Sequence, residues 1–380
     1  MRIALLIRAL TVGGAERQLV ALARGLLAGG HEVTVLVFYR AGTFLEDELA
    51  NGGVPVIDLG KRGRWSLVGF IRRLLAAVRT GEFDVVYSFL PTSNVLAAVL
   101  WGRSSRPAVI WGVRGGPART PDGDWLGRWL VAAQRWLVGG ASAVIANSAP
   151  AVDGLVARGW PPGRLRLVQN GLDDSTFRFD GPARDRLRAR WAAGPEVRVL
   201  GFAGRLDPVK GIECLLDALV IAGGEGGDLR LVLAGDGSPG YVARLRDYVH
   251  SLGVAARVSW LGVQSDMPGF YSAIDVLCLP SRSEGCSNVV AEALACGTPV
   301  VATRVGDNGA YVPDELLAIP GNAADLARGI RVALAAVSAD ARGVRRAAIL
   351  RQLAMPEMVR RTEAVLSAAV ARERAGSRGR

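Results

Sequence analysis

The sequence predicts an α/β protein made of two Rossmann-like domains, each built on a parallel β-sheet. Short apolar runs typical of buried strands alternate along the chain with runs of helical periodicity, as consecutive βαβ units require. The 380 residues are enough for two separate cores, and half of the residues are hydrophobic.

Five apolar runs in the first half are predicted as strands, because they are short and rich in branched aliphatic residues. A longer run between the first two strands is predicted as a helix. The expected strands are Arg2–Ile7, Val33–Phe38, Asp84–Ser88, Val109–Gly112 and Ala143–Asn147, and the expected helix is Ala15–Ala28.

The second half repeats this alternation, and one more helical run follows Pro356. The expected strands are Arg198–Ala203, Leu229–Ala234, Val258–Leu261, Asp275–Leu279 and Val300–Ala302, and the expected helices are Gly211–Ala222, Val289–Leu294 and Glu357–Arg372.

A polar, turn-rich stretch from Gly171 to Asp180 indicates the join between the domains. We therefore place the first domain at residues 1–175 and the second at residues 176–355. A helix over residues 356–372 could return to the first domain, and residues 373–380 are expected to form a disordered tail.

Composition limits the class of protein. The N-terminal run MRIALLI leads directly into a strand, so we expect no signal peptide. No apolar run reaches the ~18 residues of a membrane span. The four cysteines lack a C-x-x-C spacing and only two histidines are present, which argues against a structural zinc site and favours reduced thiols in a cytoplasmic protein.

The positive charge is uneven. Residues 1–170 hold 20 Lys+Arg against 11 Asp+Glu, whereas residues 171–380 hold 26 against 24, so net charges of +9 and +2 make up the total of +11. The basic first half is expected to face an anionic partner. Lys61 and Lys210 are the only lysines among 46 basic residues, so Lys210 departs from the chain's strong preference for arginine.

The segment from Ser281 to Thr303 reads as loop, helix, tight turn and strand. Glu284 lies in the loop before the helix, and Glu292 lies just over one turn inside it. Backbone N–H groups and the helix dipole at such an N-terminus favour an anion such as a diphosphate. Carboxylates nearby can accept hydrogen bonds from sugar hydroxyls. An anion joined to a polyol describes a nucleotide sugar.

Two other loops contain glycine residues between a predicted strand and a predicted helix. Gly204 to Gly211 follows a predicted strand and places Arg205 and Lys210 five residues apart at a helix start. Such cations can neutralise a departing diphosphate without a metal. Gly13 and Gly14 follow the first strand and allow close backbone approach, although the spacing is not that of a dinucleotide fingerprint.

These segments resemble the retaining glycosyltransferases of family 4, also called group 1, which have the GT-B fold. The resemblance covers nearly the whole chain, and its motifs occur in the family's order. They are the E-x7-E pair Glu284 and Glu292, the G-R-L-x-x-x-K-G loop from Gly204, the GG-x-E loop from Gly13, the AGDGP-like Gly235-Asp236-Gly237 and the N-G-[IV]-D-like Asn170 to Asp173.

The resemblance implies two domains facing across a cleft, with the acceptor bound by the first and a nucleotide sugar by the second. Arg205, Lys210 and Glu284 would be catalytic, Glu292 would contact the ribose, and no metal or other cofactor would be needed. The implied donor-binding set is Gly13, Gly14, Gly204, Arg205, Lys210, Glu284, Gly285, Cys286, Ser287, Asn288, Val289 and Glu292.

One position departs from the family pattern. Arg114 stands where many relatives carry a histidine on the acceptor side. Arginine is permanently charged and cannot act as a general base, so we expect it to bind a phosphate or carboxylate instead.

The expected activity is transfer of a hexosyl or N-acetylhexosaminyl group from a UDP- or GDP-sugar to a lipid-linked or polysaccharide acceptor in cell-envelope glycan synthesis. A sugar-nucleotide 2-epimerase or a non-catalytic sugar-nucleotide-binding protein on the same fold is the alternative. A nucleic-acid partner is not expected, because no stacking or recognition motif accompanies the charge.

Two segments bear on a membrane surface. Arg64–Arg79 has apolar residues at 67, 68, 71, 74, 75 and 78, which favours ordinary packing on a sheet. Trp125–Val138 combines three tryptophans with Arg128 and Arg135, and Trp beside Arg is favoured at a membrane interface. Packing and membrane contact are equally compatible with this second segment. We expect peripheral association with the inner face of the membrane and a polyprenyl-diphosphate-linked acceptor.

Overall fold

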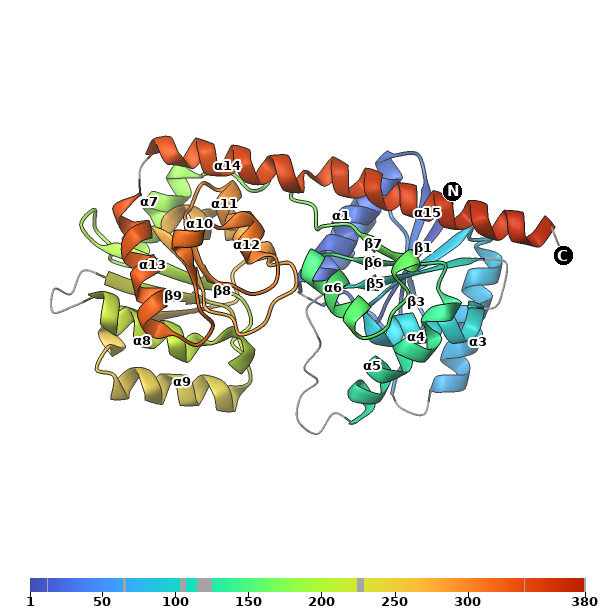
Figure 1. Ribbon diagram of the computed structural model, residues 1–380, viewed down its shortest axis with the longest axis horizontal. Helices are drawn as coiled ribbons and strands as arrows, with labels where there is room; N and C mark the ends of the chain where they lie inside the picture. Colours follow the sequence, from blue (N-terminus) through green and yellow to red (C-terminus); the bar gives the residue numbers. More distant parts are fainter. Residues whose placement is uncertain are drawn as a thin grey trace. The chain divides into compact units, whose positions relative to one another are not determined.

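The computed structural model describes residues 1–378 apart from 12, 64–65, 103–106, 115–124, 224–228 and 338. The chain divides into two compact units (Figure 1). Unit 1 comprises Met1–Gly171 and Met355–Arg380, and unit 2 comprises Leu172–Ala354. The division lies four residues before the one expected at 175, because Leu172 already pairs with the end of unit 2 at Ala354.

Among the described residues of unit 1, seven parallel strands form one sheet in the order β3-β2-β1-β4-β5-β6-β7. The central strands are buried along almost their whole length, as expected for a parallel sheet covered on both faces. The strands are β1 (Arg2–Ile7), β2 (Glu32–Val37), β3 (Val56–Asp58), β4 (Val85–Phe89), β5 (Ala108–Val113), β6 (Ala143–Ala146) and β7 (Leu165–Leu167).

Helices cover both faces of this sheet, and each face has its own apolar core. The C-terminal helix contributes Leu366 and Val370 to the first of these cores, so it is an integral part of unit 1. The helices are α1 (Gly14–Ala28), α2 (Phe44–Asn51), α3 (Leu67–Thr80), α4 (Leu90–Trp101), α5 (Trp125–Leu137), α6 (Ala149–Ala157) and α15 (Met355–Arg378).

The expected disordered tail over residues 373–380 is wrong for residues 373–378, which continue α15. The tail sequence favours a helix, because alanine, arginine and glutamate have high helix propensity. Two side chains also attach it to the sheet: the Ser142 hydroxyl donates to Glu373, and Arg374 pairs with Asp84 at 2.8 Å.

The apolar stripe predicted for α3 is buried only in part. Phe70, Leu74 and Val78 pack into the core, whereas Leu67 and Val68 are exposed. Phe70 is buried although it lies outside the predicted stripe. The helix therefore buries a narrower face than its sequence indicates.

Unit 2 repeats the architecture with six parallel strands among its described residues, in the order β10-β9-β8-β11-β12-β13. The first predicted strand of this half and the second have the same bounds in the structure, and the others differ by a residue at one end. The strands are β8 (Arg198–Ala203), β9 (Leu229–Ala234), β10 (Val258–Gly262), β11 (Val276–Leu279), β12 (Val300–Thr303) and β13 (Leu317–Ala318).

The helices of unit 2 surround one continuous core. Several begin at side-chain caps, such as Asp180, which accepts a hydrogen bond from the Ala183 amide, and Asn322, which accepts one from the Asp325 amide. The helices are α7 (Gly181–Arg190), α8 (Ile212–Gly223), α9 (Pro239–Ser251), α10 (Met267–Ala273), α11 (Asn288–Ala295), α12 (Asn308–Tyr311), α13 (Ala323–Ala335) and α14 (Ala339–Leu353).

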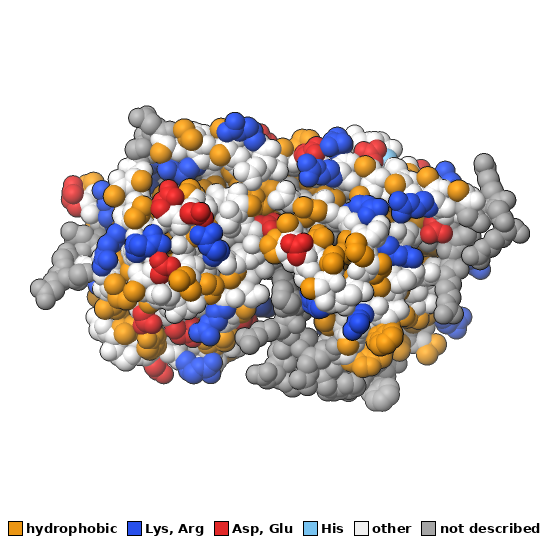
Figure 2. Space-filling view, in the orientation of Figure 1, with side chains coloured by type: hydrophobic (Ala, Val, Ile, Leu, Met, Phe, Trp, Pro, Cys, Tyr) orange, Lys and Arg blue, Asp and Glu red, His pale blue; other side chains and the backbone are white. Residues whose placement is uncertain are grey.

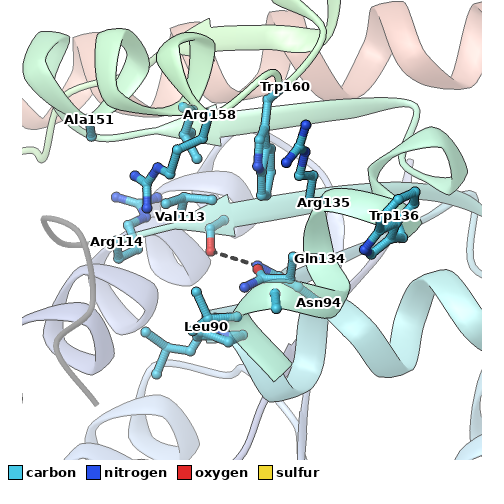
Figure 3. Close-up of a pocket in the computed structure, with 15 residues that line it drawn as sticks. Leu90, Asn94, Val113, Arg114, Gln134, Arg135, Trp136, Ala151, Arg158 and Trp160 are labelled. Carbon is cyan, nitrogen blue, oxygen red and sulfur yellow. Dashed lines mark hydrogen bonds between the residues drawn. The ribbon is translucent and has the colours of Figure 1, made fainter. Parts of the chain in front are cut away.

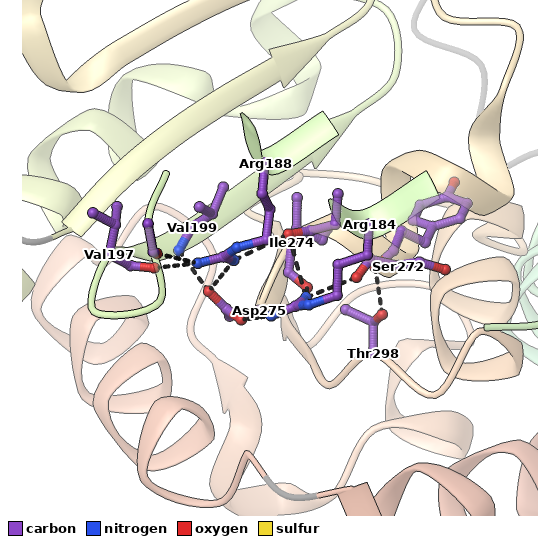
Figure 4. A network of polar contacts seen from close by, with 11 residues as sticks. Arg184, Arg188, Val197, Val199, Ser272, Ile274, Asp275 and Thr298 are labelled. Atoms are coloured by element: carbon purple, nitrogen blue, oxygen red, sulfur yellow. Dashed lines mark hydrogen bonds and ion pairs between the residues drawn. The ribbon is translucent and has the colours of Figure 1, made fainter. Parts of the chain in front are cut away.

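A buried ion-pair network holds α7 to the sheet of unit 2 (Figure 4). The Asp275 carboxylate, at the start of β11, pairs with Arg184 at 2.9 Å and with Arg188 at 3.0 Å, and it also accepts from the Val199 amide. Burial alone would raise the pKa of Asp275, but the Arg184 hydrogen bond, the Val199 amide and both arginine charges outweigh it and lower this pKa below its usual range.

Within the described part of the chain, no helix combines the length and the apolar character needed to cross a bilayer.

We predict that Asp275→Asn lowers the free energy of unfolding by about 3–5 kcal/mol, since it leaves two partly buried guanidinium groups without a carboxylate. Because the pKa of Asp275 is lowered in the folded state, its contribution is complete above about pH 4 and is lost as the pH falls toward the folded-state pKa. The difference between wild type and variant should therefore narrow at acid pH.

Urea unfolding at pH 7 and at about pH 3 measures this difference. Asp314→Asn is the matched control, because Asp314 forms an exposed pair with Arg304 and should contribute less than about 1 kcal/mol. Equal losses in the two variants at pH 7 would show that the network does not anchor α7.

Candidate functional site

The sheet order of unit 2 places two loops side by side. β8 and β11 are neighbours, but β8 leads to β9 on one side and β11 leads to β12 on the other. The chain thus reverses its direction across the sheet between these strands. In open parallel sheets, ligands bind beyond the carboxyl ends of the strands at such a switch point.

The loop after β8 has a fixed shape. Asp207 accepts from the Val209 amide at 3.0 Å and so caps the short turn Pro208–Lys210. Gly211 then takes a left-handed conformation with φ of 63°, and a Cβ there would lie 2.4 Å from the Pro280 carbonyl oxygen. Only glycine allows the two loops to approach this closely.

The opposite loop, after β11, carries the carboxylate that this approach brings to Lys210. The Lys210 ammonium donates to Glu284 Oε1 at 2.6 Å, and the buried Ser281 hydroxyl donates to the same oxygen at 2.6 Å. A backbone hydrogen bond from Arg282 to Val209, 2.7 Å long, joins the loops beside this contact. The structure therefore brings together the predicted catalytic residues Lys210 and Glu284.

Thr303, at the end of β12, and residues that follow it support the loop that carries Glu284. The Thr303 hydroxyl donates to the Ser281 carbonyl at 2.5 Å, and the buried Asn308 amide donates to the Thr303 carbonyl at 3.0 Å. The Asp307 amide donates to the Gly285 carbonyl, also at 3.0 Å. These bonds hold the backbone on both sides of Glu284.

The predicted residues Gly285, Cys286, Ser287, Asn288 and Val289 lead into and form the first turn of α11. Ser287 occupies the N-cap position, but its hydroxyl accepts no hydrogen bond from the helix backbone. That hydroxyl is buried and has no partner among the described residues. A helix N-terminus carries partial positive charge, so this turn is suited to an anion.

Glu292, the second glutamate of the motif, is buried inside α11. The hydroxyl of the fully buried Tyr271 donates to its Oε2 at 2.7 Å, which fixes the orientation of the carboxylate. Glu284 and Glu292 thus sit on one loop–helix segment, each held by a neighbouring hydroxyl.

Arg205 is not part of this contact. It lies in the same loop as Gly204 and Lys210, but 71% of its side chain is exposed and its guanidinium pairs with Asp207 at 3.5 Å. Of the two predicted cations, Lys210 is held by Glu284, whereas Arg205 is an exposed side chain at the surface of the loop.

Gly13, Gly14 and Arg114 belong to unit 1. Gly13 is the N-cap of α1 and Gly14 its first residue, and the Thr11 hydroxyl donates to Glu16 beside them. These glycines therefore form a helix start after β1, as predicted, and their donor contact remains a prediction.

Arg114 follows β5, and the contacts that the structure describes for it are with neutral groups. Its guanidinium donates to Asn170 Oδ1 at 2.8 Å and to the Tyr87 hydroxyl at 2.9 Å, and it lies 5.1 Å from the centre of the Phe89 ring. Burial raises the pKa of Tyr87, although the charge and hydrogen bond of Arg114 oppose this, so the phenol stays protonated at neutral pH.

The sequence did not identify the hydroxyls of Ser281 and Tyr271 as parts of this site. Ser281 is adjacent to the motif, but only the contact between the two loops shows that it and Lys210 share one oxygen of Glu284. Among the described residues, no group of three histidine, cysteine or carboxylate side chains lies close enough together to hold a metal ion.

Family comparisons agree with this architecture. Residues 12–176 match the model of Glycosyltransferase Family 4, and residues 197–336 match the model of Glycosyl transferases group 1. The matches fall on units 1 and 2 in turn and cover most of the chain.

Curated relatives match over a shorter stretch. A D-inositol 3-phosphate glycosyltransferase of Mycobacterium marinum is 39% identical over 157 residues, which is 38% of this chain and 31% of the relative. The corresponding protein of Rhodococcus opacus is 35% identical over 187 residues, which is 47% of this chain and 42% of the relative. The chain thus matches about a third to two fifths of the length of these relatives.

Solved structures match over almost the whole fold. Anabaena Alr3699/HepE in complex with UDP and glucose has a TM-score of 0.82 at 23% identity, covering 97% of this chain and all of that one. WaaG, a glycosyltransferase involved in lipopolysaccharide biosynthesis, has a TM-score of 0.68 at 16% identity, covering 93% and 97%. At these identities the likeness concerns the fold.

The two parallel-sheet units have the GT-B fold of these structures. The chain belongs to the glycosyltransferases that these two models describe, Glycosyltransferase Family 4 over its first unit and Glycosyl transferases group 1 over its second.

Proposed function

We propose that this enzyme transfers a hexosyl or N-acetylhexosaminyl group from a UDP- or GDP-sugar to a lipid-linked or polysaccharide acceptor in cell-envelope glycan synthesis, with retention of configuration. The observation that carries the donor half of this proposal is the contact of Lys210 with Glu284 at the switch point of unit 2. This contact brings the Lys210 cation to the Glu284 carboxylate, which could bind sugar hydroxyls, and both lie on the loops next to the N-terminus of α11.

In this proposal, the diphosphate of the donor binds between Lys210 and the first turn of α11. The ammonium at present pairs with Glu284, so the diphosphate would share or take over that contact and release an oxygen of Glu284 for the sugar hydroxyls. The buried, unpartnered Ser287 hydroxyl could donate to the same phosphate. Arg205, being long and exposed, could fold onto the diphosphate from the solvent side.

Lys210 and Arg205 would also act during the reaction. Negative charge grows on the diphosphate as its bond to the sugar breaks, and cations placed where that charge develops lower the barrier. Because these two cations can supply the neutralisation, we propose that the reaction needs no metal.

The donor proposal is supported by the fold match with HepE, whose structures contain UDP and UDP-glucose. UDP-glucose is therefore the first donor to test. Thermal shift with UDP- and GDP-sugars ranks donors, since a ligand that binds the folded state stabilises it by mass action.

The acceptor half of the proposal rests on unit 1 and its surface. On α5, the exposed fractions of Trp129 and Trp136 are 59% and 84%, so these rings do not pack into the core. On the visible, described face of unit 1, hydrophobic side chains lie with basic side chains near them (Figure 2). Exposed Trp near arginine, on a unit of net positive sequence charge, supports peripheral binding to anionic lipid.

Lys210→Ala should lower kcat/KM about 10²–10³-fold, the scale of one lost electrostatic donor to a transition state, while the protein stays folded. Turnover is measured with the donor that gives the largest thermal shift. Arg190→Ala removes an exposed cation elsewhere in unit 2 and should leave kcat/KM within about twofold.

Turnover of Lys210→Ala close to wild type would remove Lys210 from the mechanism. Incubation with donor alone is the control for the alternative activity: an epimer of the donor sugar formed without acceptor would identify a 2-epimerase instead of a transferase.

Activity should persist in excess EDTA, because the proposed charge neutralisation comes from Lys210 and Arg205. The measurement compares initial rates with and without EDTA and with added Mg²⁺ or Mn²⁺. Loss of activity in EDTA together with recovery on adding metal would contradict the role given to the two cations.

Trp129→Ser/Trp136→Ser should weaken sedimentation with vesicles that contain phosphatidylglycerol, because both rings are exposed and available to the interface. Binding of the wild type should fall as salt rises, since the attraction is screened beyond about 10 Å at ~0.1 M ionic strength. Val263→Ser, which removes an exposed apolar side chain in unit 2, is the control.

Equal recovery of wild type and double variant in the supernatant at low salt would exclude α5 as the membrane contact. Arg128 and the Trp125 side chain lie outside the described side chains, so the variant uses the two tryptophans whose exposure is defined.

A further inference from the structure

Unit 1 contains a cavity of about 490 Å³ between α4, α5 and α6, next to the end of β5 (Figure 3). The described residues that line it all belong to unit 1. Its volume is in the range of small-molecule sites in proteins. The Lys210–Glu284 contact belongs to unit 2, so this cavity is not part of the proposed donor site.

Much of the cavity wall is apolar. Leu90, Val131, Ala151, Leu155 and Trp160 line it. Trp160 is buried and packs edge-on against Trp111 at a ring separation of 5.8 Å, which fixes its position. A wall of this kind favours a hydrocarbon or ring surface over a hydrated ligand.

Three arginines, Arg114, Arg135 and Arg158, also line the cavity. None of them has a carboxylate of the described residues within 4 Å. Other arginines of unit 1, such as Arg2, Arg24 and Arg374, do pair with carboxylates, at about 3 Å. Figure 3 shows Arg114 and Arg158 toward one end of the cavity and Gln134 and Trp136 toward the other.

Among the described residues, no carboxylate pairs with the charge of Arg114. Its two terminal nitrogens donate to Asn170 and Tyr87, both neutral, and its Nε is buried without a partner among the described residues. Burying a cation against neutral groups costs free energy unless an anion compensates it. A guanidinium positioned in advance is suited to a phosphate.

We propose that this cavity binds the acceptor as a prenyl phosphate, with the phosphate at Arg114 and the start of the hydrocarbon chain along Leu90, Val131 and Leu155. The proposal rests on the proposed function and specifies the substrate class of its acceptor side. Arg135 and Arg158 are exposed and add positive potential that attracts the phosphate. A soluble phosphate would satisfy the arginines but leave the apolar wall uncovered, whereas one amphiphile satisfies both.

The test measures binding of farnesyl phosphate, farnesol and inorganic phosphate to the full chain by calorimetry, without donor. Farnesyl phosphate should bind at least about tenfold more tightly than either of the others, because each lacks one half of the recognised chemistry. Equal affinity for farnesol would remove the role of the arginines, and equal affinity for inorganic phosphate would make this a site for soluble phosphates; either result overturns the proposal.

Variants locate the binding. Arg114→Gln should weaken farnesyl phosphate at least about tenfold, the effect of one charge-assisted hydrogen bond. Ala132→Glu, at an exposed position that lines the cavity and is compatible with folding, should do the same by adding a negative charge. Arg72→Gln removes an exposed charge from α3, away from the cavity, and should bind within about twofold of wild type.

Lys210→Ala separates this proposal from the donor proposal, because it should bind farnesyl phosphate as the wild type does even though its turnover falls. Wild-type affinity in both Arg114→Gln and Ala132→Glu would overturn the cavity assignment and leave the donor site unaffected.

Discussion

The proposed donor site depends on one contact between oppositely charged groups, the 2.6 Å pair of Lys210 with Glu284. Its value is positional more than energetic, since the desolvation of a partly buried pair offsets much of the attraction. Several features serve the pair: Gly211 lets the loops approach, the Ser281 hydroxyl fixes the Glu284 oxygen, and bonds from Thr303 and Asp307 hold the loop behind it. The switch point between β8 and β11 is what brings the loops together.

In unit 1, the described hydrogen-bond partners of Arg114 are neutral, in contrast to the carboxylate that pairs with Lys210 in unit 2. Lys210 has a carboxylate that a diphosphate can replace, whereas Arg114 has only the Asn170 amide oxygen and the Tyr87 hydroxyl as described hydrogen-bond acceptors. A cation with an internal counter-ion suits a leaving group that arrives and departs in each cycle. A cation with neutral partners and an apolar cavity beside it suits an anion attached to a hydrocarbon. Under the two proposals, each unit would recognise one phosphate-bearing substrate, which would account for the basic charge of the first half.

Much of this could be predicted from sequence because it is local. Strands such as β1 and β8 are continuous apolar runs, and Lys210 stands out in a chain that otherwise uses arginine. What could not be predicted depends on pairing across the fold. Ser281 and Tyr271 gain their roles from neighbours brought by the sheet order, and α7 was not predicted, because Asp275, which pairs with its arginines, lies far along the chain. Residues 373–378 were expected to be disordered, but they continue α15, and Glu373 and Arg374 contact Ser142 and Asp84, which directly precede β6 and β4.

The central claim is that Lys210 binds the diphosphate of the donor, and the most direct measurement compares the affinities of UDP and uridine for wild type and Lys210→Ala. The two ligands differ only in the diphosphate, so the ratio of their affinities isolates its contribution. We expect wild type to favour UDP strongly and the variant to lose about 10–100-fold of that preference, the effect of one charge-assisted hydrogen bond, with uridine affinity unchanged. An equal preference for UDP in both proteins would contradict the claim, and the diphosphate would then have to be held by other residues.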